Sequence, residues 1–297
     1  MFDKTHIDDY SIFLADVRRA PANTISSYIR DIRKFADFLS ADGKSDFSGV
    51  TQDDVRAFLS VLKENGRSPA TISRCIASLK AFFNRLVDVG SFASNPTVGI
   101  RTVAADKKPP RILTGDDITL LLEQPDTKDS RGCRDKAMLE TLYATGIRVS
   151  ELIALDESDV NLAAGLVTCR NGKERVVPIH EAACKAITHY LSNARPIMAE
   201  TGESALFVNA NGERMTRQGF WKILKGYTEK AQISVDVTPQ TLRHSFAAHL
   251  IENGANLQML QEILGHAGIS STQAYARAVK RQLKEVYSKA HPRAAAT

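Results

Sequence analysis

The chain has 297 residues, of which 39 are basic and 34 acidic, giving a formal net charge of +5 at pH 7. With 43% hydrophobic and 25% charged residues, it is neither a disordered polar chain nor a membrane protein, and its length suggests two domains. No apolar run reaches the ~20 residues of a membrane-spanning helix, and the first ten residues lack the pattern of a signal peptide. We therefore expect a cytoplasmic protein with no membrane partner, whose basic balance permits a polyanionic partner without demanding one.

Helices are predicted throughout the first part of the chain. Apolar residues at helical spacing predict helices over 5–18, 22–39, 51–63 and 69–89. Thr51 before an acidic first turn, and Ser68 before Pro69, are typical helix starts. This part therefore predicts a helical domain.

Basic side chains lie among the polar positions of these predicted helices. They include Arg30, Arg33, Lys34, Arg74 and Lys80. Such residues usually form only a solvated helix surface, and contact with phosphate groups is the alternative. The residues of this part alone leave both interpretations open.

A second domain is predicted beyond a proline-bounded connection at 95–110, with a boundary near residue 106. Its predicted elements are helices over 114–124, 134–145 and 149–155, strands over 166–169 and 175–179, a helix over 182–194, a strand over 205–208 and several later helices. Asn171-Gly172 between the first two strands is a strong hairpin signal. The fold expected is mainly α with a small antiparallel β-sheet in this domain. The four cysteines, Cys75, Cys133, Cys169 and Cys184, match no metal or disulfide pattern, so we expect reduced and mostly buried thiols.

Arg148 lies where a helix is predicted to end at Gly146 and another to begin. The planar fork of an arginine in such a turn suits a phosphate. The alternative is a structural arginine that binds helix-end carbonyls or pairs with Glu151 three residues on. Both remain open at this point.

A second polar cluster lies near the start of a helix that Thr238 caps and Pro239 opens. Gln240 and Arg243 share one face there, close to the helix N-terminus, which is a natural place for an anion. His249 lies by the apolar stripe of the same helix, where a histidine is most simply a hydrogen-bonded partner of the core.

A third stretch holds His266, directly after a helix-ending glycine, and Tyr275. Tyrosine in an amphipathic helix is usually a packing residue, but its phenol can also attack phosphorus. Two arginines could then neutralise the phosphate oxygens. A histidine could hydrogen-bond the phosphate or help move the proton, and a hairpin lysine could protonate the leaving 5′ oxygen. Such a reaction would need no metal ion and no cofactor.

The chain resembles the tyrosine recombinases, and within them the Xer site-specific recombinases. Residues 134–152 resemble the first arginine box of that family, 242–250 the second, and 263–275 its histidine-to-tyrosine segment. The resemblance implies a helical core-binding, SAM-like DNA-binding domain over 1–105 and a catalytic domain over 106–297. The two domains would form a clamp around DNA, and contact with DNA would explain the basic residues on the helices of the first domain.

The resemblance makes Arg148 and Arg243 the phosphate-binding arginines, His266 the histidine of the third box and Tyr275 the nucleophile. Gln240 departs from the family, which usually has histidine or lysine there. Glutamine can donate a hydrogen bond to a phosphate oxygen, but it does not titrate near neutral pH. Slower cleavage is therefore expected.

The predicted hairpin departs from the family as well. Its usual lysine aligns with Arg170, whereas Lys173 lies just across the turn. Lys173 is the favoured acid for the leaving group because arginine is a poor proton donor. Arg170 remains the positional alternative.

The function that the resemblance implies is strand cleavage and rejoining through a 3′-phosphotyrosyl intermediate and a Holliday junction. The expected partners are double-stranded DNA with inverted-repeat half-sites and other recombinase protomers in a homo- or heterotetramer, with a DNA translocase as a further candidate. Resolution of chromosome or plasmid dimers is expected. The alternatives are an integrase of a phage, integron or transposon, and a catalytically impaired DNA-binding accessory protein.

Overall fold

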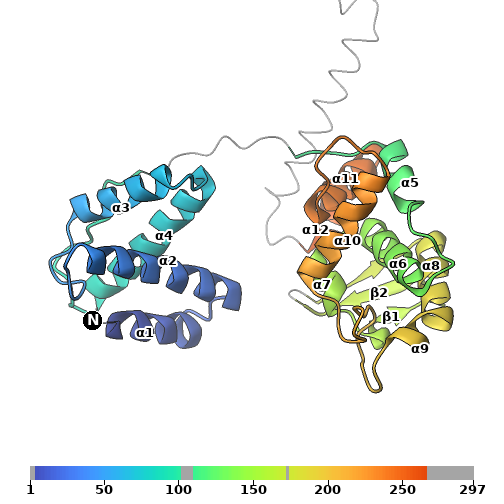
Figure 1. The fold of residues 1–297 in the computed structure, drawn as a ribbon, viewed down its shortest axis with the longest axis horizontal. Helices are drawn as coiled ribbons and strands as arrows, with labels where there is room; N and C mark the ends of the chain where they lie inside the picture. The colour runs from blue at the N-terminus through green and yellow to red at the C-terminus, as the bar shows by residue number, and fades with distance from the viewer. Residues whose placement is uncertain (1–3, 102–109, 172–173, 266–297) are drawn as a thin grey trace, which may run out of the picture. The chain divides into compact units, whose positions relative to one another are not determined.

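Two compact units make up the chain, Met1–Lys107 and Lys108–Thr297 (Figure 1). The computed structural model describes residues 4–101, 110–171 and 174–265. Within these residues both units are mostly helical, and the only strands form a three-stranded antiparallel sheet in the second unit. The predicted fold class, mainly α with a small antiparallel sheet, is confirmed. None of the helices in these ranges is long and apolar enough to cross a membrane.

Among residues 4–101, the first unit contains four helices and one π-helical turn. They are α1 (Thr5–Ile12), the π-helical turn (Phe13–Val17), α2 (Ala22–Ala41), α3 (Gln52–Glu64) and α4 (Pro69–Asp88). The Thr51 hydroxyl accepts from the Asp54 N–H, and the Asp54 carboxylate accepts from the Thr51 N–H, so α3 starts with a complete capping box. Ser68 caps α4, and Pro69 occupies its first turn. These starts agree with the prediction, whereas the predicted first helix changes to π geometry after Ile12.

Phenylalanine rings fill the core of the first unit. Phe35, Phe47, Phe82 and Phe83 are fully buried. The Phe47 and Phe82 ring centroids lie 4.9 Å apart in an edge-to-face arrangement, which aromatic quadrupoles favour. This core fixes α2 against α4.

The second unit contains eight helices, a 3-10 turn and three strands among the described residues. They are α5 (Gly115–Leu122), α6 (Ser130–Thr145), α7 (Val149–Ala154), the 3-10 turn (Glu157–Asp159), β1 (Val160–Asn161), β2 (Leu166–Cys169), β3 (Arg175–Pro178), α8 (Glu181–Asn193), α9 (Arg195–Met198), α10 (Arg217–Lys230), α11 (Pro239–Glu252) and α12 (Leu257–Leu264). Strand β2 is central in the order β1-β2-β3, and Val167 pairs with Val177.

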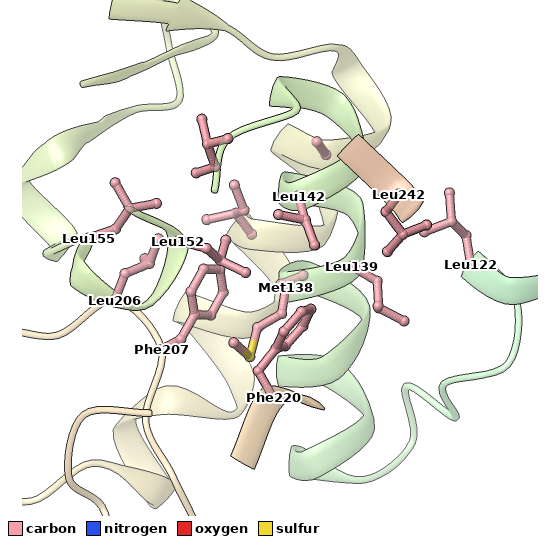
Figure 2. Close-up of a cluster of buried hydrophobic side chains, with 14 of the residues drawn as sticks. Leu122, Met138, Leu139, Leu142, Leu152, Leu155, Leu206, Phe207, Phe220 and Leu242 are labelled. Carbon is pink, nitrogen blue, oxygen red and sulfur yellow. The ribbon is translucent and has the colours of Figure 1, made fainter. Parts of the chain in front are cut away.

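Helix α6 runs through the middle of the second unit, with α8 and α11 packed beside it (Figure 1). Met138 of α6 lies against the rings of Phe207 and Phe220, while Leu139 and Leu142 extend the same cluster along the helix (Figure 2). All five side chains are at most 1% exposed. Burial of each side chain of this size contributes about 1.5–3 kcal/mol to the free energy of folding. These contacts therefore hold α6 in place, and with it the turn that follows its C-terminal end.

The predicted strand over 205–208 does not form, and only two isolated bridges occur at its ends. All four residues are at most 1% exposed, so their backbone groups need partners. Arg195 donates from Nε to the Ala205 carbonyl at 3.1 Å, and Arg134 donates from Nη1 to the Val208 carbonyl at 3.2 Å. Arginine side chains therefore bind the two end carbonyls, while the Leu206 N–H donates to the Leu155 carbonyl and the Phe207 carbonyl accepts from the Met215 N–H.

Candidate active site

A surface cavity of about 390 Å³ lies between the starts of α7, α10 and α11. Three of the predicted site residues, Arg148, Gln240 and Arg243, line it together with Arg217 and Trp221. The structure thus brings together residues from two distant segments of the chain. Sequence reasoning did not single out Arg217 and Trp221, because nothing in their local pattern distinguishes them from an ordinary exposed helix face.

Arg148 is the residue just before α7, where Gly146, in the left-handed region at φ +59°, has ended α6. Its N–H donates to Oε2 of Glu151 at 2.7 Å, and its Nη1 donates to Oε1 at 3.1 Å. The side chain nevertheless stays 45% exposed. The predicted pairing with Glu151 is therefore present, and the guanidinium also lines the cavity.

Arg243 lies on α11 and is only 2% exposed. Its Nη1 donates to the Gly146 carbonyl at 2.6 Å, and its Nη2 donates to the Leu264 carbonyl at 2.7 Å. These carbonyls belong to the C-terminal ends of α6 and α12, where the helix dipole favours a cation. Two helix ends therefore fix one positive charge at the wall of the cavity.

Gln240 lies one turn before Arg243 on α11. Its Nε2 lies 2.8 Å from Nε2 of His244. Burial, and then the charge of Arg243, lower the pKa of His244 below its ordinary value of 6.5. The neutral ring nitrogen therefore accepts a hydrogen bond from the Gln240 amide, which sets the orientation of that amide at the cavity.

His249 belongs to the core, as predicted. Its Nε2 lies 3.0 Å from the Leu113 carbonyl, which can only accept, so Nε2–H is the donor. Its Nδ1 lies 2.8 Å from the Tyr143 hydroxyl. With both ring nitrogens bound to core groups, His249 joins α11 to α6 and to the segment before α5.

Glu151 and Arg175 form a buried ion pair that the sequence analysis did not predict. Arg175 donates from Nη1 and Nη2 to the two carboxylate oxygens of Glu151 at 2.9 and 3.0 Å. Burial opposes the charge of Glu151, but the hydrogen bonds from Arg175 and from the Arg148 N–H lower its pKa below the ordinary value of 4.5. The alternation of residues along a strand could have predicted this pair. Arg175 lies on the same face of β3 as the buried Val177, and an arginine on a buried face needs an acidic partner.

The end of α12 receives side chains from three arginines. Arg175 donates from Nε to the Ile263 carbonyl at 2.6 Å, Arg243 donates to Leu264, and Arg148 makes a longer contact of 3.4 Å with the Gly265 carbonyl. Gly265 is in the left-handed region at φ +62°, and a Cβ atom there would lie 3.0 Å from the Arg175 Cζ. Glycine is therefore required where α12 ends. The predicted His266 and Tyr275 lie outside the described residues.

Arg170, the positional candidate of the hairpin, follows β2. Its Nη1 lies 2.7 Å from Oδ1 of Asp159. The arginine side chain is 59% exposed and the aspartate side chain only 5%, so the ion pair draws the arginine toward the sheet. Lys173, the favoured candidate, lies outside the described residues.

The basic residues predicted to bind DNA fall into two groups in the first unit. Arg30, Arg33 and Lys34 are exposed on α2 and line a shallow surface hollow, and Lys80 is exposed on α4. Arg74 differs from these four, because it is half-buried. These exposed side chains are available to a polyanion.

Arg74 forms an ion pair with Asp31, which is 3% exposed. The same carboxylate accepts a hydrogen bond from the Ser78 hydroxyl at 2.9 Å. Arg74 therefore ties α4 to α2, a role in the packing of the unit that the sequence pattern did not reveal.

Family models match both units. The model of the phage integrase family matches residues 111–282, and that of the phage integrase N-terminal SAM-like domain matches residues 7–90. Among solved structures, the XerA recombinase is 28% identical with a TM-score of 0.55, and covers 97% of this chain and 98% of its own. The XerH site-specific recombinase bound to a palindromic difH substrate is 22% identical with a TM-score of 0.75, over 95% of this chain and 84% of its own, and shares the fold.

Curated relatives match over nearly the whole chain. The tyrosine recombinase XerD of Oceanobacillus iheyensis is 46% identical over 294 residues, which cover 97% of this chain and 98% of the relative. The tyrosine recombinase XerD of Listeria monocytogenes is 41% identical over 293 residues, which cover 97% and 99%. These matches confirm the resemblance that the arginine boxes carry. The chain therefore belongs to the phage integrase family and is a tyrosine recombinase of the Xer type.

Proposed function

We propose that this recombinase exchanges DNA strands at sites with two inverted-repeat half-sites, through a 3′-phosphotyrosyl intermediate at Tyr275 and a Holliday junction. The convergence of Arg148 and Arg243 on one cavity supports this function most directly. Two guanidinium groups are suited to neutralise the non-bridging oxygens of one phosphate as charge develops in the transition state. Arg148 reaches the phosphate from the exposed rim, and Arg243 acts from the buried wall.

Three further residues, Gln240, His266 and Lys173, orient the phosphate or move protons in this proposal. The Tyr275 hydroxyl loses its proton as it attacks phosphorus, and the leaving 5′ oxygen must gain one. Gln240 orients the phosphate by hydrogen bonding, because an amide cannot accept and release a proton near neutral pH. His266 hydrogen-bonds the same phosphate and takes the proton that the Tyr275 hydroxyl loses.

Lys173 protonates the leaving oxygen in this proposal, and Arg170 does not. Arginine holds its proton with a pKa above ~12, which makes it a poor acid. The ion pair of Arg170 with Asp159 also occupies its guanidinium within the protein.

Residues 1–105 act as the core-binding domain, and residues 106–297 act as the catalytic domain. The match of residues 7–90 to the SAM-like domain model supports the first assignment. The exposed Arg30, Arg33, Lys34 and Lys80 contact DNA phosphates, a sequence-independent term that falls with rising salt. Arg74 contributes mainly by holding α4 against α2.

The partners follow from the chemistry of strand exchange. Two duplexes, each cut on one strand per step, require several protomers on DNA, so the working form is a homo- or heterotetramer. The relatives named XerD favour resolution of chromosome or plasmid dimers in the cytoplasm, with a DNA translocase as a further partner. The proposed reaction needs no cofactor, because the phosphotyrosine ester conserves the energy of the phosphodiester bond.

Plasmid resolution tests this function. DNA sites enriched from genomic fragments by binding to the chain are placed as direct repeats in one supercoiled plasmid. The account predicts two product circles with the unchanged chain, and none with Tyr275→Phe, which still binds the site. Binding without circles from the unchanged chain, Gln240→His and Arg170→Lys alike would favour the accessory-protein alternative.

A further inference from the structure

Arg175 lies at the centre of the contacts around the end of α12, yet it does not line the cavity that holds the two proposed phosphate-binding arginines. It is buried, and its three side-chain nitrogens bind Glu151 and the Ile263 carbonyl. Unlike Arg243, which lines the cavity, Arg175 directs both terminal nitrogens at the carboxylate of Glu151, so we do not place it on the DNA phosphate.

We propose that Arg175 is a positioning residue, which fixes the end of α12, directly before His266 in the sequence, relative to Arg148 and Arg243. The inference rests on the proposed roles of these residues in cleavage. It adds to them a residue that acts through others and does not touch the phosphate.

The first argument is the weakness of α12 on its own. The helix has eight residues, of which only Leu260 and Leu264 are fully buried. Isolated helices of this length are unstable in water, so their position depends on tertiary contacts. The hydrogen bonds from Arg175 Nε to the Ile263 carbonyl at 2.6 Å and from Arg243 Nη2 to the Leu264 carbonyl at 2.7 Å are such contacts to the last turn.

The second argument is the carboxylate that Arg175 and Arg148 share. Oε1 of Glu151 accepts from Nη1 of both arginines, at 2.9 and 3.1 Å. A shift of α12 that moves Arg175 therefore also disturbs the group that orients Arg148. This coupling matters because an error of about 1 Å at a reacting centre costs ~100-fold in rate.

The third argument is that lysine cannot replace Arg175. A single ammonium nitrogen cannot bind both oxygens of Glu151 and the Ile263 carbonyl in the geometry of a planar fork. A Cβ atom added at Gly265 would lie only 3.0 Å from the Arg175 guanidinium, so the flat group packs directly beside the end of the helix.

Arg175→Lys is the test, and Arg195→Lys is its matched control. Arg195 is also a buried arginine that pairs with a carboxylate, Glu157, and donates to backbone carbonyls. It lies on α9, and these partners, Glu157, Glu203 and Ala205, do not belong to α12. Three quantities are measured for each variant: the single-turnover rate of covalent adduct formation on nicked site DNA, the dissociation constant for that DNA, and hydrogen exchange of residues 257–265 without DNA.

The proposal predicts that Arg175→Lys lowers the adduct rate about tenfold or more while the dissociation constant changes less than about twofold. Exchange over 257–265 rises in Arg175→Lys and stays unchanged in Arg195→Lys. Gly265→Ala is a second variant that keeps every charge: its Cβ presses on Arg175, and it is expected to slow cleavage in the same way. Combined with Arg175→Lys, it should add little, because both remove one support.

An Arg175→Lys variant that cleaves within about twofold of the unchanged chain would overturn the inference, as would equal losses in Arg195→Lys. Unchanged exchange over 257–265 would overturn it as well. If the unchanged chain itself forms no adduct, the proposed function fails and the inference fails with it. Cleavage by the unchanged chain therefore separates the two failures.

Discussion

Replacing Glu151 with glutamine removes the negative charge that two arginines share beneath the cavity. The carboxylate is 2% exposed and Arg175 is 8% exposed, so this is a buried ion pair with a bidentate geometry. Glu151→Gln keeps the size of the side chain. It leaves the Arg175 guanidinium buried beside a neutral amide whose NH₂ group cannot accept a hydrogen bond.

The expected loss follows from the burial of the two charges. Breaking a buried pair by removing one partner costs about 3–5 kcal/mol, because the remaining charge is left uncompensated. The second arm, to Arg148, is worth at most about 1 kcal/mol since that arginine is 45% exposed. A loss of about 3–5 kcal/mol is a large part of the roughly 5–15 kcal/mol that stabilises a typical protein.

The lowered pKa of Glu151 also predicts how the loss of stability depends on pH. Because the pKa of Glu151 is lowered in the folded state, its contribution is fully present above the ordinary value of 4.5 and is lost as pH falls through the folded value. The glutamine variant has no such group. The difference in unfolding free energy between the two chains is therefore largest at neutral pH and narrows below pH 4.5.

Urea unfolding followed by the fluorescence of Trp221, the chain's single tryptophan, measures this difference in the second unit. Glu181→Gln is the control, because Glu181 pairs with Lys185 in an exposed ion pair and its removal is expected to change little. A loss below about 1 kcal/mol at pH 7, or a difference that stays constant from pH 7 to pH 4, would refute the reasoning.

Three other substitutions carry predictions of their own. Gln240→His restores a titratable group beside the phosphate and should raise the single-turnover cleavage rate at least about tenfold; an unchanged rate would show that glutamine does not limit cleavage. His244→Gln should flatten the pH dependence of stability. The pKa of His244 lies below 6.5 in the folded state, so this residue makes the unfolding free energy fall as pH drops from 7.5 through 6.5, and an identical slope of unfolding free energy against pH in the variant would contradict this. Asp31→Asn, which weakens the tie to Arg74, should cost about 1–3 kcal/mol, seen as faster hydrogen exchange in α2 and α4, and unchanged exchange there would count against it.

The helix starts of this protein could be predicted because they depend on neighbouring residues. Thr51 and Asp54 complete a capping box within one turn, and Thr238 caps α11 directly before Pro239. Gly146 ends α6 in the left-handed region, as its position after an apolar helix predicted. Such signals do not require knowledge of the rest of the fold.

Contacts between segments that are far apart in the sequence could not be predicted from local sequence patterns. The stretch over 205–208 has the composition of a buried strand, but Arg195 and Arg134 bind its terminal carbonyls, and no local pattern reveals that. The ion pair between Glu151 and Arg175 likewise depends on β3 lying beside α7 and α12. Convergence of the site residues could be expected only from the resemblance to a family.

Covalent attachment of DNA to one tyrosine tests the central claim most directly. The chain is incubated with nicked suicide DNA that carries its site, the SDS-resistant adduct is isolated, and nuclease and trypsin reduce it to a nucleotide-bearing peptide for mass spectrometry. The account predicts that the added mass lies on the tryptic peptide 244–277, at Tyr275, and that Tyr275→Phe binds the DNA without forming the adduct. An adduct that persists in Tyr275→Phe, or maps to another residue, would contradict it.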